Sequence, residues 1–147
     1  GGGAGAQVET ERLGRFPFFR GIAPEALQEI ARLFVAEKFD AGVRAVRQGE
    51  EGDKFYILVR GKVEVVLDGD EDPGKSKRLA VLEDGDHFGE IALLRGVPRT
   101  ANVVALTPCV CLALYRQDFL PLLTRHPSIR EALEASLQLR NQRSEVR

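Results

Sequence analysis

The sequence contains no methionine, only two histidines and only two cysteines, and it has no long hydrophobic run. No apolar stretch approaches the roughly 18 residues that a membrane-spanning helix requires, so no transmembrane segment is predicted. No signal-peptide pattern is present either. The two histidines, His87 and His126, stand far apart and are too few for the clustered ligands of a cupin-type metalloenzyme. These absences argue against a membrane span and against a histidine-rich metal centre in this sequence.

An excess of charge of either sign is also lacking, since 21 basic residues stand against 22 acidic ones and the net charge is −1. A general attraction to nucleic acid or to an anionic membrane is therefore not expected, and a ligand phosphate would need a local set of donors. Cys109 and Cys111 are two positions apart, too extended for a comfortable disulfide within a strand. Two free thiols fit a reducing compartment, so we expect a cytoplasmic domain, including the cytosolic domain of a membrane protein.

The length of 147 residues suits one domain with one hydrophobic core, because 44% of the residues are hydrophobic. The glycine-rich start and the absence of methionine at position 1 indicate a module taken from a longer chain, with residues 1–12 as a linker or cloning remnant. The folded domain is predicted over residues 13–142. Residues 143–147 are predicted to be a frayed tail, because the polar run that starts at Arg140 has no apolar anchor.

Hydrophobic periodicity divides the chain into a helix, a β-rich body and two further helices. Pro24 opens a stretch with apolar residues at helical spacing, and three phenylalanines just before it predict a short element docked on the same core. Between residues 35 and 115, short β-rich runs alternate with glycine turns, which indicates a sandwich, barrel or roll rather than a parallel α/β sheet. The predicted strands cover residues 54–59, 62–67, 78–82, 102–106 and 109–114.

Helical spacing returns after Tyr115. Phe119, Leu122 and Leu123 line a short helix that Pro121 should weaken by removing a hydrogen bond. A longer helix is predicted after Pro127, with an apolar stripe at Ile129, Leu133 and Leu137. Its start carries Ser128 and Glu131 at the spacing of a capping box.

The segment Gly69-Asp70-Glu71-Asp72-Pro73-Gly74-Lys75-Ser76 matches the P-loop pattern letter for letter, but its context argues against a nucleoside triphosphate site. A P-loop needs a following helix, whereas residues 77–82 predict a short strand. The alternating aspartates of this loop resemble a calcium loop, yet Pro73 and Leu79 stand where that motif needs glycine and glutamate. We expect a solvated hairpin loop here.

The stretch from Phe88 to Ala101 is the strongest candidate for a functional site. Gly89 follows a strand and allows the backbone to approach a ligand, and residues 90–94 can form a helical turn with free N–H groups for an anion. A loop then brings Arg99 back to this turn, and its planar guanidinium suits a pair of phosphate oxygens. Glu90 would repel a bare phosphate but would accept a neighbouring hydroxyl. Phosphate plus hydroxyl on one small ligand indicates a ribose cyclic phosphate.

This stretch closely resembles the phosphate-binding cassette of cyclic-nucleotide-binding domains, as found in cyclic-nucleotide-dependent kinases, cyclic-nucleotide-regulated channels and the catabolite activator protein. The resemblance is carried by Phe88-Gly89-Glu90-Ile91-Ala92-Leu93 and Pro98-Arg99-Thr100-Ala101. Upstream, Arg47-Gln48-Gly49-Glu50-Glu51-Gly52-Asp53, Phe55-Tyr56-Ile57-Leu58 and Gly61 follow the family's order, and the likeness extends from Phe16 to about Arg140. It implies a mainly β fold with flanking helices: a jelly-roll-like β-roll with an N-terminal helix and two C-terminal hinge and lid helices.

The resemblance also implies roles for single residues. Gly89, Ile91 and Ala92 would offer backbone N–H groups to the cyclic phosphate or the ribose edge. Glu90 would accept the ribose 2′-hydroxyl, and Arg99 would pair with the equatorial phosphate oxygens. The structural alternative for the two charged residues is an ion pair between them in an empty domain.

Phe88, Thr100, Ala101 and Arg140 complete the predicted site. Thr100 would touch the phosphate and could reach the amino group of a syn guanine, or its hydroxyl is simply satisfied in a strand. Arg140 matches a position where some channels place an arginine over the base, and the alternative is a solvated helix charge. Gly49 and the other upstream glycines are expected to be turn formers.

The resemblance implies a regulatory domain without enzymatic activity, metal or cofactor, which binds cAMP or cGMP, with cAMP favoured. It would signal through its C-terminal helix to an effector outside this sequence, such as a channel, transporter, kinase or regulator. Direct binding of nucleic acid by these residues is not expected. The alternatives are a docking domain of the same fold that has lost binding, and the sensor half of a catabolite-activator-type transcription factor.

Overall fold

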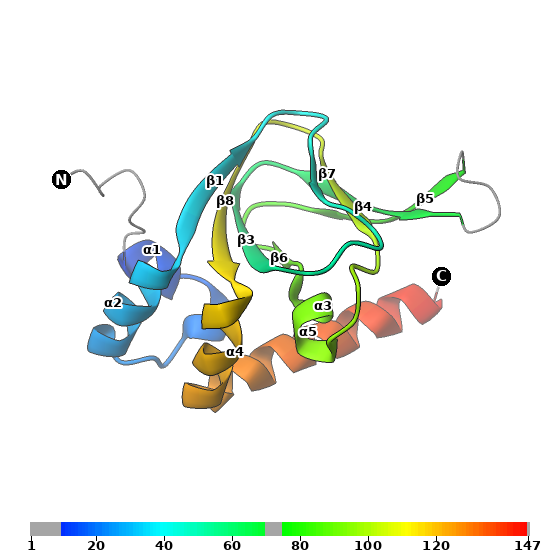
Figure 1. The fold of residues 1–147 in the computed structure, drawn as a ribbon. Helices are drawn as coiled ribbons and strands as arrows, with labels where there is room; N and C mark the ends of the chain where they lie inside the picture. The colour runs from blue at the N-terminus through cyan, green and yellow to red at the C-terminus, as the bar shows by residue number, and fades with distance from the viewer. Residues whose placement is uncertain (1–9, 70–74, 147) are drawn as a thin grey trace.

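The computed structural model describes residues 10–69 and 75–146, with side chains as far as residue 140. Two four-stranded antiparallel sheets form a roll, and helices gather at one end of it (Figure 1). Helices come first and last: α1 (Thr10–Gly14), the 3-10 helix η1 (Pro17–Phe19), α2 (Pro24–Leu33), α4 (Arg116–Arg125) and α5 (Pro127–Val146). Between them lie β1 (Val35–Phe39), β2 (Arg44–Val46), β3 (Lys54–Arg60), β4 (Val63–Asp68), β5 (Ser76–Leu82), β6 (His87–Phe88), α3 (Glu90–Arg95), β7 (Asn102–Ala105) and β8 (Cys109–Tyr115).

The strand orders are β1-β8-β3-β6 in one sheet and β2-β7-β4-β5 in the other. All five predicted strands are present, and β1, β2 and β6 complete the roll. The strand β5 begins at Ser76, so the residues after the P-loop-like segment form a strand and not a helix, as predicted. Residues 70–74 of that segment lie outside the described residues.

The two central strands of the first sheet are buried on both faces, which explains their nearly continuous hydrophobic sequence. Successive side chains of a strand point to opposite faces, so each strand contributes to two clusters. The cluster inside the roll includes Tyr56, Leu58, Cys109, Cys111 and Ala113. The cluster beneath the helices includes Phe55, Ile57, Leu112 and Leu114. Both cysteines are free and buried, as the sequence indicated.

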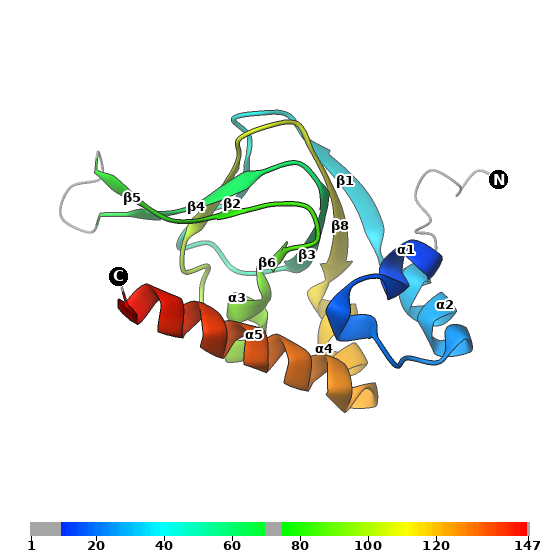
Figure 2. The same cartoon turned by 180° about the vertical axis from the view of Figure 1, so that it is seen from behind.

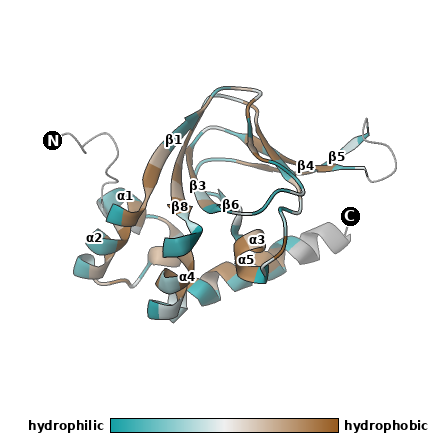
Figure 3. Ribbon diagram, in the orientation of Figure 1, coloured by the Kyte–Doolittle hydropathy of each residue, from teal (hydrophilic) through white to brown (hydrophobic). Residues whose placement is uncertain are grey.

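The helices cover the outer face of the β1-β8-β3-β6 sheet and share one core with it. The phenylalanines of η1 join this core, as predicted, together with residues of α2 and α4 and with Ile129 and Leu133 of α5. Figure 3 shows hydrophobic residues along the central strands and α3, and hydrophilic residues on the outer turns of α2 and α4. Seen from behind, α5 crosses the whole base of the roll and passes beside α3 and β6 (Figure 2). The C-terminal helix is thereby brought next to the predicted site.

The predicted capping box of α5 is wrong. The helix begins at Pro127, so Ser128 lies inside the first turn and cannot be the N-cap residue. Proline is favoured at that first position because the N–H it lacks would have no partner within the helix. The neighbouring helix α4 continues through Pro121, as the sequence predicted for a short helix containing that proline.

The two predicted domain ends differ from the described backbone. α1 begins at Thr10, within the segment assigned to a linker, and its Leu13 is fully buried; residues 1–9 lie outside the described residues. At the other end α5 continues to Val146, whereas the sequence predicted a tail from residue 143. Residue 147 is not among the described residues.

Candidate functional site

The site is built around Gly89, which joins β6 to α3. Its φ of +90° lies in the left-handed region that favours glycine. A Cβ atom placed there would lie 3.0 Å from Nη1 of Arg99 and 3.0 Å from the carbonyl oxygen of Lys54. Both the turn and the close approach of Arg99 therefore need glycine at this position.

Arg99 is buried, with 6% of its surface exposed, and its guanidinium is held by backbone carbonyls. Nη1 donates to the carbonyl oxygen of Gly89 and Nη2 to that of Lys54, each at 2.7 Å. Nη2 also lies 3.6 Å from Oδ1 of Asp53. An arginine has five N–H donors, so this arrangement fixes the side chain and leaves donors for a ligand. Burial lowers the pKa of Arg99, but an arginine stays charged at any ordinary pH.

The loop before β3 supplies two site residues that sequence analysis did not single out. Asp53 provides the carboxylate beside Arg99, although its side chain is mostly exposed. Gly52 was expected to be a turn former, but it has no positive φ and serves close packing instead. A Cβ atom on Gly52 would lie 2.6 Å from the Cβ atom of Ala92. In the sequence, Gly52 and Asp53 belong to the upstream segment that resembles the family, and this was the available signal for both residues. Only the fold shows that they contact the segment around Arg99.

Glu90 is the first residue of α3 and is 1% exposed. Its Oε1 atom lies 3.1 Å from Nη1 of Arg140 and 3.4 Å from Nδ1 of His87. Burial by itself would raise the pKa of Glu90, but the interaction with His87 and the charge of Arg140 outweigh it and hold that pKa below its usual range. Glu90 is therefore a buried carboxylate in its charged form near neutral pH.

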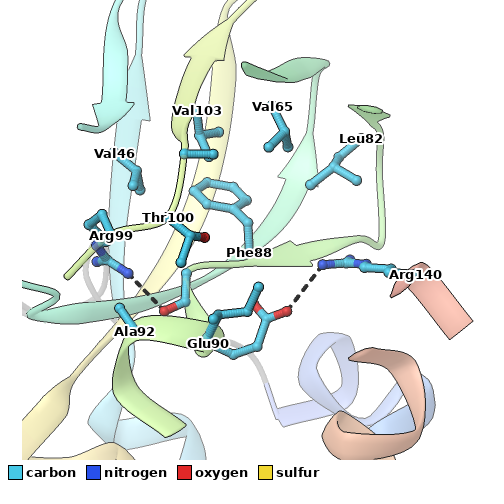
Figure 4. A pocket seen from close by; sticks show the side chains of 13 residues that line it. Val46, Val65, Leu82, Phe88, Glu90, Ala92, Arg99, Thr100, Val103 and Arg140 are labelled. Carbon is cyan, nitrogen blue, oxygen red and sulfur yellow. Dashed lines mark hydrogen bonds and ion pairs between the residues drawn. The ribbon is translucent and has the colours of Figure 1, made fainter. Parts of the chain in front are cut away.

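The predicted alternative, an ion pair between Glu90 and Arg99, is not formed. Among the described residues, the carboxylate within ion-pair distance of Arg99 is that of Asp53, and the basic groups beside Glu90 are the guanidinium of Arg140 and the ring of His87. Figure 4 shows Arg99 and Arg140 on opposite sides of Glu90. The two predicted ligand groups thus belong to separate networks.

Arg140 reaches the site from α5, and it is not the solvated helix charge given as the alternative, because it contacts Glu90 and His87. In addition to its contact with Glu90, its Nη2 donates to the carbonyl oxygen of His87 at 2.8 Å. The side chain is 31% exposed. In this state Arg140 fastens the C-terminal helix to β6 and α3.

All nine predicted site residues line one pocket (Figure 4). These residues are Phe88, Gly89, Glu90, Ile91, Ala92, Arg99, Thr100, Ala101 and Arg140. Apolar side chains from four other strands complete the wall, namely Val46, Val65, Leu82 and Val103. The sequence analysis assigned Val65, Leu82 and Val103 to strands and Val46 to none, and it placed none of the four at the site, because their common position depends on how the two sheets pack. The pocket combines charged groups at its base with an apolar wall above them.

The family model for the cyclic nucleotide-binding domain matches residues 36–126. The chain belongs to the cyclic nucleotide-binding domain family. It is 38% identical over 104 residues to "cGMP-dependent protein kinase, isozyme 1" from Drosophila melanogaster, covering 70% of this chain and 14% of the kinase. It is 34% identical over 124 residues to the "Cyclic AMP receptor protein" of Thermus thermophilus, covering 84% of this chain and 56% of that protein.

A solved structure of the regulatory subunit of a "cAMP-independent protein kinase A" from Trypanosoma brucei is similar to this cyclic nucleotide-binding domain in fold. The TM-score is 0.77 and the identity 32%, with 87% of this chain and 45% of that chain covered. The β-roll with flanking helices is therefore confirmed, as is the family resemblance seen in the sequence. The chain spans about half or less of the length of these relatives.

This cyclic nucleotide-binding domain is a regulatory module, similar to regulatory subunits of kinases and to a receptor protein. None of the helices that the structure describes is long and apolar enough to cross a bilayer. The same part of the chain has no group of three or more His, Cys, Asp or Glu side chains that could hold a metal ion.

Proposed function

We propose that this domain binds a 3′,5′-cyclic nucleotide, with the cyclic phosphate at Arg99 and the ribose 2′-hydroxyl at Glu90. The observation that carries the proposal is the pair of buried, separately held charges in one pocket, a guanidinium and a carboxylate. Burying a charged side chain is costly unless it is paired. A domain that buries a guanidinium and a carboxylate at the same pocket can therefore bind a ligand that carries both an anionic group and a hydroxyl.

The phosphate would be bound by backbone and side chain together. Arg99 retains N–H groups beyond those donated to the two carbonyl oxygens, and a guanidinium matches two phosphate oxygens at once. The backbone N–H groups of Gly89, Ile91 and Ala92 stand at the start of α3, where helical hydrogen bonding leaves N–H groups unused. These groups form the local set of donors that a nearly neutral chain needs in order to bind an anion.

For the base we propose adenine, hence cAMP rather than cGMP. Besides the charged groups, Thr100 is the polar side chain among the described residues of the pocket, and the wall is otherwise apolar. Guanine carries one more polar group than adenine, and an unpaired polar group costs free energy on burial. One hydroxyl on Thr100 could hydrogen-bond a syn guanine, which makes cGMP the weaker ligand and not an excluded one.

We further propose that binding is signalled through α5 to an effector outside these residues, such as a kinase, channel, transporter or regulator. Arg140 links α5 to the cassette, so a ligand that engages Glu90 changes the partners of that helix. Phe119 and Leu120 of α4 would repack as α5 folds over the base. A ligand shifts such an equilibrium only by binding the two states with different affinity.

Calorimetric titration tests the ligand. We expect cAMP to bind most tightly, cGMP more weakly, and adenosine, 5′-AMP and ATP much more weakly, because they lack the cyclic phosphate. A Thr100→Ala variant should lose more affinity for cGMP than for cAMP; equal losses would make Thr100 a phosphate contact only. Failure of every nucleotide to bind would favour the docking domain without ligand, and equal binding of adenosine and cAMP would refute the role of Arg99.

The signal is tested by the distance between spin labels on α5 and on the roll. Cysteines introduced at Arg130 and Lys62, which are exposed, can be labelled because both native thiols are buried. We expect cAMP to shift the distance distribution. An unchanged distribution in a domain that binds cAMP would contradict the role of α5. The alternative of a transcription factor concerns the effector alone and would need a helix-turn-helix outside these residues.

A further inference from the structure

His87 is a buried polar residue beside the site that has no role in the proposed function. It is 6% exposed and lies in β6, two positions before Gly89. Its ring packs edge-on against Phe18 at 5.4 Å between centroids and is tilted against Phe55 at 5.8 Å. The aromatic neighbours hold the plane of the ring, so the positions of its two nitrogens are set by the fold.

The two ring nitrogens of His87 face different elements. Nε2 lies 3.2 Å from the hydroxyl oxygen of Ser136 on α5. Nδ1 forms no hydrogen bond of good geometry in the described part of the chain, and the carboxylate atom near it is Oε1 of Glu90 at 3.4 Å. A buried nitrogen without a well-placed partner is rare and costs free energy. Its direction, toward the carboxylate assigned to the ribose, points to a role in ligand binding.

Both basic side chains beside Glu90 contact the same carboxylate oxygen. Arg140 and His87 approach Oε1, which leaves Oε2 without an ion pair among the described residues. Because Arg140 and His87 both contact Oε1, the carboxylate of Glu90 cannot rotate freely, and Oε2 has a defined position. The carboxylate is then oriented before a hydroxyl arrives, which reduces the entropy lost on binding.

We propose that His87 is a positioning residue for Glu90: its Nδ1–H holds the carboxylate for the ribose 2′-hydroxyl, while Nε2 ties the same ring to Ser136 of α5. The proposal rests on the proposed function and names the residue that makes Glu90 selective for a ribose hydroxyl. With Nδ1 as the donor, Nε2 of a neutral ring accepts the hydrogen bond of Ser136. Recognition of the ribose and the position of α5 thus share one side chain.

The test compares cAMP with 2′-deoxy-cAMP, whose missing hydroxyl reports on Glu90 alone. The measured quantity is the ratio of the two dissociation constants, obtained by calorimetry. In the wild type we expect 2′-deoxy-cAMP to bind about 10-fold or more weakly, since a hydrogen bond to a charged group is lost. His87→Phe keeps the ring packing and removes both nitrogens, so it should reduce the ratio to about 3-fold or less, through weaker binding of cAMP.

Two further variants separate positioning from packing. The amide nitrogen of Asn matches Nδ1 and that of Gln matches Nε2, so His87→Asn should keep most of the ratio and His87→Gln should lose it. Ser136→Ala, which frees the ring from α5, should lower the ratio less than His87→Phe does. His126→Asn is the control, because that histidine is the C-cap residue of α4 and does not line the pocket of the site.

Each outcome has a definite meaning. A wild-type ratio that persists in His87→Phe would overturn the proposal and leave the proposed function intact. Equal loss of affinity for both nucleotides in all three His87 variants would show a structural role and would also overturn it. A wild type that binds neither nucleotide would refute the proposed function itself, and a wild type that binds both equally would refute the role of Glu90.

Discussion

Arg140 and Glu90, fifty positions apart in the sequence, form an ion pair with Nη1 3.1 Å from Oε1. Glu90 is almost completely buried, whereas Arg140 keeps about a third of its side chain in contact with solvent. The pair therefore joins an interior carboxylate of the proposed ligand pocket to the surface of the C-terminal helix. It connects the proposed binding site directly to the helix that we propose transmits the signal.

Removal of the positive charge of Arg140 should destabilise the ligand-free domain. Arg140→Gln leaves Glu90 with His87 as its partner, and an incompletely paired buried charge is costly. Because Arg140 is partly exposed, we expect a loss of about 1–2 kcal/mol in the free energy of unfolding, measured by urea titration. Arg130→Gln, an exposed change on the same helix, is the control and should change little. Equal stability of the two variants would show that the Glu90 pair contributes nothing.

Acid should weaken the fold through Glu90. Its pKa is lower in the folded domain than the ordinary value of 4.5, so the unfolded chain takes up the proton first as the pH falls. The stability that charged Glu90 contributes is present above about pH 4.5 and is lost as the pH falls through the lower folded pKa. Urea midpoints between pH 6 and pH 3 should therefore fall more steeply in the wild type than in Glu90→Gln. Parallel profiles would contradict the assignment.

Arg99→Ala should impair both binding and folding. Loss of a charged partner of the phosphate costs about 2–5 kcal/mol, hence roughly 30-fold or more in affinity. The variant also strands the carbonyl oxygens of Gly89 and Lys54, so its melting temperature without ligand should fall. Arg99→Lys keeps the charge but lacks the planar fork and should also bind weakly. Thermal melts with and without cAMP measure both effects; a variant that keeps the full ligand-induced shift would refute the phosphate contact.

Gly52→Ala should disturb the pocket although Gly52 does not line it, because Gly52 packs against the pocket residue Ala92. The new Cβ atom would lie 2.6 Å from that of Ala92, and neither atom can move without its backbone. We expect α3 to shift, with a loss of at least 10-fold in cAMP affinity measured by calorimetry. Gly85→Ala is the matched control: its φ of +93° makes an added side chain unfavourable, but its surroundings are open. The control should lose stability while its affinity stays close to that of the wild type.

Thiol labelling should report unfolding and ligand binding together. Burial raises the pKa of Cys111 to about 12, so its thiol is protonated near neutral pH and reacts slowly with alkylating agents. Cys109 is buried as well. We expect labelling only after unfolding, and saturating cAMP should slow it further, because a ligand of the native state stabilises it. Mass spectrometry would detect the modification; rapid labelling of the folded domain would contradict this expectation.

The sequence by itself determined the order of elements and the chemistry of the cassette. Five of the described strands showed as β-rich runs between glycines, whereas β1 and β2 did not, and the site residues from Phe88 to Ala101 form one contiguous stretch. Glycine before glutamate and a following arginine specify local backbone geometry and local charge, which do not depend on distant residues. The family resemblance added the position of Arg140 but not its contacts.

Tertiary structure alone decided which groups meet. Arg99 binds the carbonyl oxygen of Lys54, forty-five positions away, and Glu90 takes its cation from Arg140 rather than from Arg99. Ser136 reaches His87 only because α5 crosses the base of the roll. Such contacts depend on how sheets and helices pack, and packing is set by the burial of many side chains at once. No local pattern of residues encodes the combined effect of all these buried side chains, so the partners of each charged group became known only from the fold.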